Sequence, residues 1–318
     1  MSLDGAEFPC TVRDRVTNLL CYEPVGEVMG MDGRPRTATE VRARKGGPPL
    51  VMVTAYDAPS ARTVDAAGAD IILVGDSVAM VVLGYDDTLE VTIDDMARHV
   101  AAVHRAKPGA LIVGDLPWLS YHGSHDRTLD NVARLVRAGA GAVKLEGGAK
   151  RLDTVRAILD AEVPVMGHLG LTPQSLHALG GFKVQGQELN AAKILVDDAR
   201  ALVDAGVFAL VLECVPDAVA RTITDEVSVP TIGIGAGRHV DGQVLVWHDL
   251  LGFSGADRPQ PRFVRQYAQL EKVATTALGR FCADVRAGTY PSSKETYHLA
   301  DRVLAAFAAE TDTSVSSV

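Results

Sequence analysis

The sequence predicts a (β/α)8 TIM barrel of the α/β class, with an N-terminal extension and added C-terminal helices. Three observations predict it. Short apolar runs alternate with segments of helix length, as in parallel sheets whose strands are buried on both faces. About eight such runs are present, which favours a closed sheet over an open one. The 318 residues hold one barrel, which takes roughly 250 residues, plus terminal additions.

The composition excludes several other classes of protein. Hydrophobic residues make up 47% of the chain and aromatic residues 5%, so disorder of the whole chain is excluded. The net charge of -9 argues against a nucleic-acid partner, which would need clustered Lys and Arg. The four cysteines fit neither a zinc site nor a disulfide scaffold, so we expect free thiols. With no signal-peptide pattern and no apolar run of roughly 20 residues, we expect a cytoplasmic protein without membrane segments.

We expect three parts along the chain. Residues 1–36 mix Gly, Pro, Asp and Arg without sustained periodicity, so they are predicted to be an extension. Residues 37–298 are predicted to form the barrel together with its C-terminal helices, of which one or two lie in residues 264–287. Residues 299–318 are predicted to be a tail, with a Ser/Thr/Val-rich end that has the composition of disordered chain.

The barrel elements follow in order from a first strand at residues 51–55. A helix of small residues ending at Ala67 comes next, and the phrase ADIILVGDS then supplies the second strand. Later strands are expected at residues 110–115, 142–146, 163–167, 208–213 and 229–234 and within the apolar segment 243–251. Helices are expected at residues 93–105, 126–138, 149–160, 191–205 and 217–226. The phrases AGAD, RAGAGA and DAGVFA place Gly just after a helix, where a left-handed cap is favourable.

One connection is longer than the others. Residues 169–190, between the expected strand at 163–167 and the helix at 191–205, form an insert rich in Gly and polar residues. Loops of this length are often functional lids, so we expect the insert to lie over the site.

Five apolar runs end in groups that can bind a metal, move a proton or hold an anion. The runs are ILVGDS, LIVGDLPW, AVKLEGG, VPVMGHLG and ALVLEC. They place these side chains at strand ends: Asp76, Asp115, Lys144, Glu146, His168 and Glu213. Because catalytic groups gather at the carboxyl ends of barrel strands, we expect most of them to share one pocket. A single acid at such a position can also be a helix cap.

Three of these side chains, Asp76, Asp115 and Glu146, are carboxylates at neighbouring strand ends. They would repel one another unless a cation neutralised them. Oxygen ligands that leave positions for water and substrate are typical of Mg²⁺, which Mn²⁺ or Co²⁺ could replace. The alternative is that these acids cap helices or pair with arginines.

The other three side chains have several candidate roles. Lys144 shares a strand face with Glu146 and can bind a substrate carboxylate or form a Schiff base. Glu146 and a nearby metal favour binding of the carboxylate, and the alternative is a structural ion pair. Glu213 lies four or more β/α steps from Asp76, across the barrel mouth, where it suits a general base. It can also be a buried acid satisfied by its neighbours. His168 either orients the substrate, donates to an oxyanion or is structural.

Seven motifs follow one another in the chain: VGDS, GDLPW, VKLEGG, GHLGLTPQS, GGFKVQG, LECVP and GIGAG. Together they resemble the ketopantoate hydroxymethyltransferase family from about Thr37 to His298. The resemblance implies a barrel of the phosphoenolpyruvate/pyruvate superfamily, a Mg²⁺ requirement and a place in pantothenate and coenzyme A synthesis. It implies α-ketoisovalerate (3-methyl-2-oxobutanoate) and methylene-tetrahydrofolate as substrates. It also implies a large homo-oligomer, such as a decamer.

The resemblance also implies roles for the residues of these motifs. Asp76 of VGDS would contact the metal directly or through water, and Ser77 would contact the keto acid. Asp115 of GDLPW and Glu146 of KLEGG would complete the metal site. The residues expected around the substrate are thus Asp76, Ser77, Asp115 and Lys144.

For the chemical step, the resemblance implies that Lys144 binds the keto acid, Glu213 of LECVP accepts the proton and His168 lies close to the reacting centre. Two other interpretations stay open. One is a lyase or mutase of the same superfamily, which would also use Mg²⁺ and a stabilised enolate; the motifs GHLGLTPQS and LECVP favour the transferase. The second is a catalytically silent oligomeric scaffold or binding protein, against which the retained acids and Lys144 argue.

Overall fold

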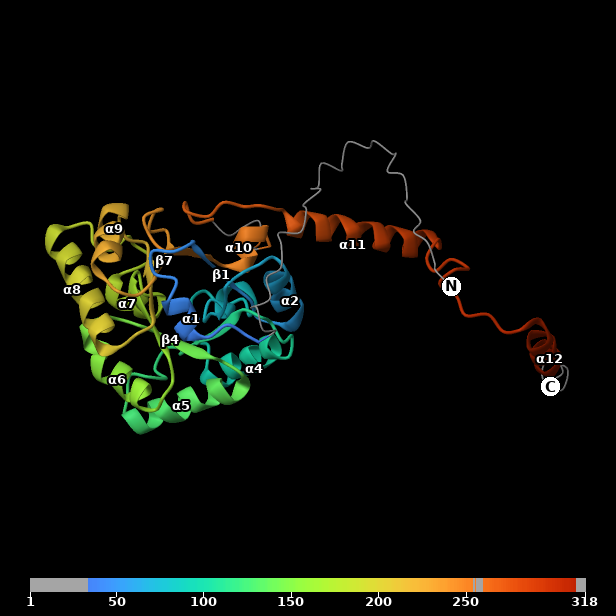
Figure 1. Cartoon of the computed structure of the whole chain (residues 1–318). Helices are drawn as coiled ribbons and strands as arrows, with labels where there is room; N and C mark the ends of the chain where they lie inside the picture. Colours follow the sequence, from blue (N-terminus) through green and yellow to red (C-terminus); the bar gives the residue numbers. More distant parts are fainter. Residues whose placement is uncertain (1–33, 254, 256–259, 313–318) are drawn as a thin grey trace, which may run out of the picture. The chain divides into compact units, whose positions relative to one another are not determined.

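The computed structural model describes residues 34–253, 255 and 260–312 of the chain. Its described part contains a closed barrel of eight parallel strands that pair in chain order (Figure 1). The strands are β1 (Leu50–Thr54), β2 (Ile71–Val74), β3 (Leu111–Asp115), β4 (Ala142–Glu146), β5 (Val165–Gly170), β6 (Ala209–Glu213), β7 (Thr231–Ile234) and β8 (Gly242–Leu245). Because β8 also pairs with β1, each of these strands has a neighbour on both sides. The predicted fold class is confirmed.

Helices lie on the outside of this barrel (Figure 1). They are α1 (Ala38–Arg42), α2 (Ala58–Ala66), α3 (Val78–Val81), α4 (Ile93–His104), α5 (His125–Ala138), α6 (Leu152–Asp160), α7 (Leu176–Leu179), α8 (Leu189–Ala205), α9 (Asp217–Glu226) and α10 (Trp247–Leu251). Capping boxes at Thr37, Asp57 and Thr92 begin α1, α2 and α4. Gly139 and Gly206 end α5 and α8 in the left-handed conformation, as the recurring glycine phrases predict.

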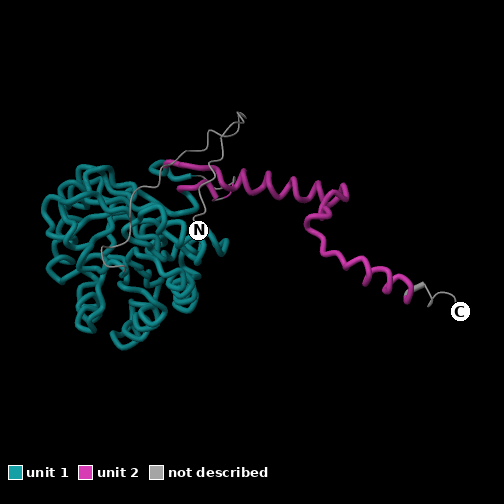
Figure 2. The backbone as a smooth tube through the Cα atoms, turned by 45° about the vertical axis from the view of Figure 1, so that its right-hand side comes forward, with its two compact units in different colours: residues 1–249, 260–264 teal, residues 250–259, 265–318 magenta. Residues whose placement is uncertain are grey.

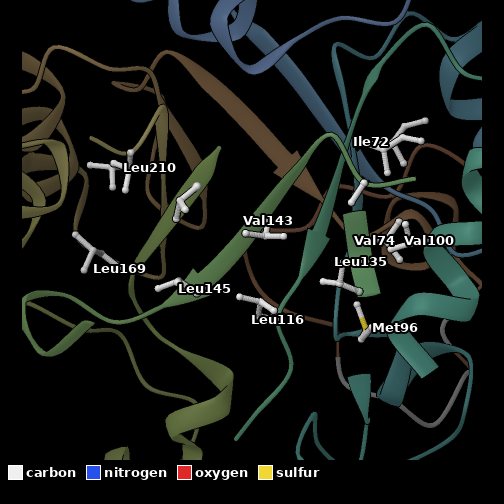
Figure 3. Close-up of a cluster of buried hydrophobic side chains, with 14 of the residues drawn as sticks. Ile72, Val74, Met96, Val100, Leu116, Leu135, Val143, Leu145, Leu169 and Leu210 are labelled. Carbon is white, nitrogen blue, oxygen red and sulfur yellow. The ribbon is translucent and has the colours of Figure 1, made fainter. Parts of the chain in front are cut away.

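The strands alternate between two hydrophobic cores. In β2, Ile71 and Leu73 belong to the core inside the barrel, whereas Ile72 and Val74 belong to the core between barrel and helices. Figure 3 shows part of this outer core. Its labelled side chains are Ile72, Val74, Met96, Val100, Leu116, Leu135, Val143, Leu145, Leu169 and Leu210. Full burial of one such side chain contributes about 1.5–3 kcal/mol, so the outer core fixes the helices against the strands.

Two strand predictions need correction. The fifth strand is β5, not residues 163–167, because it starts after Pro164 and its pairing with β6 continues to Gly170. His168 therefore lies within a strand and not after one. The apolar segment 243–251 is not one strand but contains the short β8 and then α10. The insert 169–190 is also not a plain loop, because it carries a 3₁₀ turn (η2, Pro173–Ser175) and α7.

Two acids hold the strands together at their amino ends. Asp70 accepts a hydrogen bond from Val51 N at 2.8 Å and pairs with Arg36 and Arg44. Asp241 accepts hydrogen bonds from Lys45 Nζ and Thr231 N, both at 2.9 Å. Burial raises the pKa of Asp241, but the bonds from Thr231, Lys45 and Gly46 outweigh it, so the pKa lies below its usual value. Asp241 thus joins the segment before β1 to the strand pair β7–β8.

The described residues fall into two compact units (Figure 2). The first, residues up to 249 with 260–264, holds the barrel. The second holds α11 (Leu270–Ala287), which lies in the predicted segment 264–287, and α12 (Asp301–Asp312), which lies in the predicted tail. No described helix is both long enough and apolar enough to span a bilayer.

Some predictions fall on residues that the structure does not describe. They concern residues 1–33 of the expected extension and residues 313–318 of the expected disordered end. The division of the chain at residues 36 and 298 stays a prediction. Of the four cysteines, Cys214 and Cys282 lie in the described part and are free thiols, as expected.

Candidate active site

The carboxyl ends of the strands bring the predicted site residues together. They are Asp115 at the end of β3, Lys144 and Glu146 in β4, His168 in β5 and Glu213 at the end of β6. Strand register pairs Asp115 with Lys144. It also pairs Glu146 with His168. All five have the same parity along their strands as the residues of the inner core, so their side chains point into the barrel.

Asp76 and Ser77 reach the same mouth from the turn after β2. The backbone N–H of Asp76 donates to Asp115 Oδ2 at 3.1 Å, and Ser77 Oγ lies 2.8 Å from Tyr56 Oη. A Cβ at Gly75 would stand 2.8 Å from Ser77 Oγ and 3.5 Å from Asp115 Oδ2. Glycine is therefore needed for this approach. The structure thus places all seven predicted residues at one end of the barrel, while their chemical roles stay predictions.

Lys144 is buried among acids. Its Nζ lies 2.6 Å from Asp115 Oδ1, and both side chains are at most 4% exposed. Burial lowers the pKa of Lys144, but the negative charges of Asp115, Glu146 and Asp76 outweigh it and raise the pKa above its usual value. A Schiff-base lysine needs a depressed pKa, so this environment favours a permanent ammonium that binds an anion.

His168 lies between two acids from the neighbouring strands. Its Nδ1 is 3.3 Å from Glu146 Oε1, and its Nε2 is 3.1 Å from Glu213 Oε2. Burial and the Lys144 ammonium lower the pKa of His168, yet the hydrogen bonds with Glu146 and Glu213 raise it to about 9. The two flanking carboxylates therefore favour the charged form of the ring. Lys144 Nζ also lies 3.4 Å from His168 Nδ1, and the direction of that hydrogen bond depends on the tautomer of the ring.

The three neighbouring acids fit a divalent cation by their chemistry. Burial and the charges of Asp115 and Glu146 raise the pKa of Asp76 well above its usual value. Burial also raises the pKa of Asp115, although Lys144 opposes the shift. A bound cation would relieve this repulsion, and a set of carboxylate oxygens suits Mg²⁺. As the side chains stand, no three His, Cys, Asp or Glu residues of the described chain are grouped as metal ligands, and Lys144 lies against Asp115 instead.

Two residues of the site escaped the sequence analysis. Gln174, in η2, is 5% exposed and contacts both Asp76 and Glu146. Tyr121, after β3, donates its O–H to Gln174 Oε1 at 2.7 Å. Gln174 lies inside the motif GHLGLTPQS, so a polar residue in the first turn after a barrel strand was the available signal. Tyr121 gave no comparable signal, because its place depends on the path of a loop.

Comparison with known proteins identifies the family. The family model described as ketopantoate hydroxymethyltransferase matches residues 36–293. The chain belongs to this family. It is 56% identical over 257 residues to the 3-methyl-2-oxobutanoate hydroxymethyltransferase of Syntrophomonas wolfei, covering 80% of this chain and 92% of the relative. The enzyme of that name from Moorella thermoacetica is 54% identical, over 82% of this chain and 97% of its own. The ketopantoate hydroxymethyltransferase resemblance is confirmed, and the protein is an enzyme of the hydroxymethyltransferase class.

Solved structures share the fold at low identity. A phosphoenolpyruvate phosphomutase from Streptomyces platensis subsp. rosaceus is similar with a TM-score of 0.53 and 15% identity, covering 87% of this chain and 96% of that one. A 2,3-dimethylmalate lyase of the PEP mutase/isocitrate lyase superfamily is similar with a TM-score of 0.53 and 17% identity, covering 82% of this chain and 89% of that one. These matches support the barrel fold that the family resemblance implies.

Proposed function

We propose that this enzyme transfers a hydroxymethyl group from methylene-tetrahydrofolate to α-ketoisovalerate (3-methyl-2-oxobutanoate). The product is ketopantoate, which would serve pantothenate and coenzyme A synthesis. The names of the relatives support the acceptor and the transferred group. The observation that carries the proposal is a set of buried contacts at the barrel mouth. Lys144 contacts Asp115, and His168 contacts both Glu146 and Glu213. This set combines an anion-binding cation with a carboxylate that can accept a proton.

A magnesium ion is part of the proposal. Asp76, Asp115 and Glu146 would hold it, since they offer buried oxygen ligands whose mutual repulsion a cation relieves. A phosphonopyruvate hydrolase of similar fold, with a TM-score of 0.53 and 13% identity, was solved in complex with oxalate and Mg²⁺. When bound, Mg²⁺ would supply the stabilisation of negative charge that forms on the keto acid.

The chain's own residues supply binding and proton transfer. Lys144 binds the carboxylate of the keto acid through its ammonium group and so holds the substrate in the orientation that the reaction needs. Glu213, with a side chain 17% exposed, is more open than His168 at 2%, so it can face a substrate. It removes the C3 proton and leaves an enolate. His168 holds Glu213 in place through its Nε2, 3.1 Å from Glu213 Oε2. C3 then bonds to the one-carbon unit of the folate. Water supplies the hydroxyl group as the carbon–nitrogen bonds to that unit break, and tetrahydrofolate leaves with its two nitrogens protonated by the proton taken from C3 and by the second proton of the water.

The assembly and location are also proposals. We infer a cytoplasmic homo-oligomer, such as the decamer that the family resemblance implies. In support, α11 has no side chain buried by the described residues, and it exposes Leu278, Phe281 and Val285 at helical spacing. Such a stripe needs a covering partner.

Proton exchange at C3 tests the proposed reaction. The purified enzyme is incubated with Mg²⁺ and α-ketoisovalerate in D₂O, and NMR follows the C3 proton before and after methylene-tetrahydrofolate is added. Exchange followed by ketopantoate supports the transferase. Exchange without product would instead indicate a related enzyme that uses another electrophile. Absence of both would contradict the site and support a silent scaffold.

A further inference from the structure

We propose that Gln174 is a positioning residue that orients Asp76 and Glu146 toward one bound cation. The proposal rests on the proposed function only for the statement that these carboxylates hold a divalent ion. Gln174 comes from the root of the insert after β5, whereas Asp76 lies in the turn after β2 and Glu146 ends β4. One residue thus ties together carboxylates that the strand register leaves apart.

The contacts of Gln174 use every hydrogen of its polar groups. Nε2 donates to Asp76 Oδ2 at 2.8 Å and to Leu116 O at 2.9 Å. The backbone N–H donates to Glu146 Oε2 at 3.0 Å. Oε1 accepts from Tyr121 Oη at 2.7 Å. Because the side chain is buried, any of these bonds that is lost leaves a polar group without water to replace it.

The orientation of the amide follows from its neighbours. Leu116 O can only accept a hydrogen bond, so the NH₂ group must face it, and the second hydrogen of that group then points to Asp76 Oδ2. Tyr121 Oη accepts from Glu146 N at 3.2 Å, and its own hydrogen points to the nearest acceptor, Gln174 Oε1. With the amide reversed, Oε1 would stand 2.9 Å from Leu116 O, another acceptor. Tyr121 therefore selects the amide orientation that Asp76 requires.

Asp76 depends on this amide. Among the described residues, Gln174 is the side chain that donates a hydrogen bond to the Asp76 carboxylate. Glu146 is held at both oxygens, by His168 at Oε1 and by Gln174 at Oε2. The rotation of both acids is thus restricted by one residue. Groups that orient metal ligands in this way typically change metal affinity by 10–100-fold when they are removed.

The insert carries this tie at its buried root. Leu171, Thr172 and Gln174 are each at most 7% exposed, whereas Phe182 at the tip is 54% exposed. The Ser175 N–H donates to Thr172 O and closes the turn that carries Gln174. The root of the insert is therefore part of the binding site, whatever the tip does.

The test measures binding of Mn²⁺ alone to the full-length protein, by the EPR signal of the free ion. Gln174→Leu keeps the volume and removes the amide, so we expect affinity for Mn²⁺ to fall by about 10–100-fold. Tyr121→Phe keeps the donors of Gln174 but frees its orientation, so a smaller loss is expected. In the double variant the loss should equal that of Gln174→Leu alone, because both changes act through one amide.

Asn131→Leu is the matched control. Asn131 is a buried amide that donates to Ser120 O at 2.7 Å and contacts no acid of the site in the hydrogen bonds of the structure. Its loss should lower the midpoint of thermal unfolding without changing affinity for Mn²⁺. The control separates loss of a buried hydrogen bond from loss of ligand orientation.

Two results would overturn the proposal. One is wild-type affinity for Mn²⁺ in folded Gln174→Leu, and the other is a wild-type protein that binds no Mn²⁺. If Gln174→Leu does not fold, the Tyr121→Phe variant decides: unchanged affinity overturns the proposal and reduced affinity supports it. If the variants lose affinity while the wild type makes no ketopantoate, the role of Gln174 stands and the proposed reaction falls.

Discussion

At the residue scale, each buried cation of the mouth has an acid within contact distance. Lys144 pairs with Asp115 in a fully buried contact. His168 is shared between Glu146 and the more open Glu213. Loss of one member of such a pair leaves its partner charged in a low-dielectric interior, which typically costs about 3–5 kcal/mol. The charges of this site therefore have to be considered together and not one by one.

The residues of this mouth were largely predictable from sequence. Apolar runs that end in an acid, a lysine or a histidine place side chains at the carboxyl ends of strands, and parity then fixes which side they face. The contacts that these side chains make with one another were not predictable. The approach of His168 to Glu213 and the position of Gln174 depend on strand register and on the turn after β5. Neither leaves a periodic signal in the chain.

Glu213→Gln tests the proposed base. The amide keeps the size of Glu213 but cannot accept the C3 proton, so we expect exchange of that proton in D₂O to slow by about 10²–10⁴-fold. NMR measures the rate, and the thermal unfolding midpoint serves as the check on folding. Exchange at the wild-type rate would assign the base to another group.

At the element scale, the fit between prediction and structure depends on what ends each element. Strand β4 and helix α9 have the predicted bounds, since Gly141 and Gly147 flank β4 and Pro216 precedes α9. The prediction for β5 was wrong because its end is set by pairing with β6 and not by a breaker in its own sequence. Tertiary pairing of this kind overrides local patterning.

Gly170→Ala tests the junction of β5 and β6. Gly170 has a φ of +94°, and a Cβ there would stand 2.1 Å from Glu213 O. The backbone of Glu213, whose side chain is the proposed base, would have to move. We therefore expect loss of more than about 3 kcal/mol of unfolding free energy together with loss of activity. Urea unfolding measures the first.

Gly181→Ala is the control for that substitution. It also has a positive φ, +114°, but nothing lies within 4 Å of its Cβ position. We expect a cost of only about 1–2 kcal/mol from backbone strain. Equal effects at both glycines would show that crowding at Gly170 is unimportant.

Asp241→Asn tests the contacts at the amino ends of the strands. The folded-state pKa of Asp241 lies below its usual value, so its carboxylate stabilises the fold above the unfolded-state pKa of 3.8. This contribution is lost as the pH falls through the lower, folded-state pKa. We expect the variant to be less stable by about 1–3 kcal/mol at pH 7, and the difference should shrink as the pH falls below about 4. Urea unfolding at several pH values measures it; a constant difference would contradict the depressed pKa.

At the scale of the whole molecule, the barrel unit and the unit with α11 and α12 differ in how they bury their apolar residues. The barrel encloses its hydrophobic side chains in two cores, whereas α11 leaves Leu278 64% and Phe281 49% exposed. Composition and length predicted the barrel, because enclosure of a core leaves a periodic pattern. The partner of an exposed helix leaves no such pattern in the chain that carries it.

Leu278→Asp tests whether α11 is covered in the proposed homo-oligomer. A charge in an apolar contact is not easily buried, so the assembly should dissociate to smaller species. Light scattering after gel filtration measures the mass of the particle. Arg280→Asp is the control, because Arg280 is an exposed polar residue of the same helix. An unchanged mass in Leu278→Asp would show that this stripe is not an interface.

Closure of the sheet has a further consequence for how such enzymes diversify. The carboxylates that hold the strands, Asp70 and Asp241, lie at the amino ends of β2 and β8. The acids proposed for the chemistry, Asp76, Asp115 and Glu213, lie at the opposite, carboxyl ends of strands. Inherited changes at the mouth can therefore alter the reaction while the scaffold stays assembled. The solved barrels of a phosphomutase and a lyase share this fold at 15% and 17% identity.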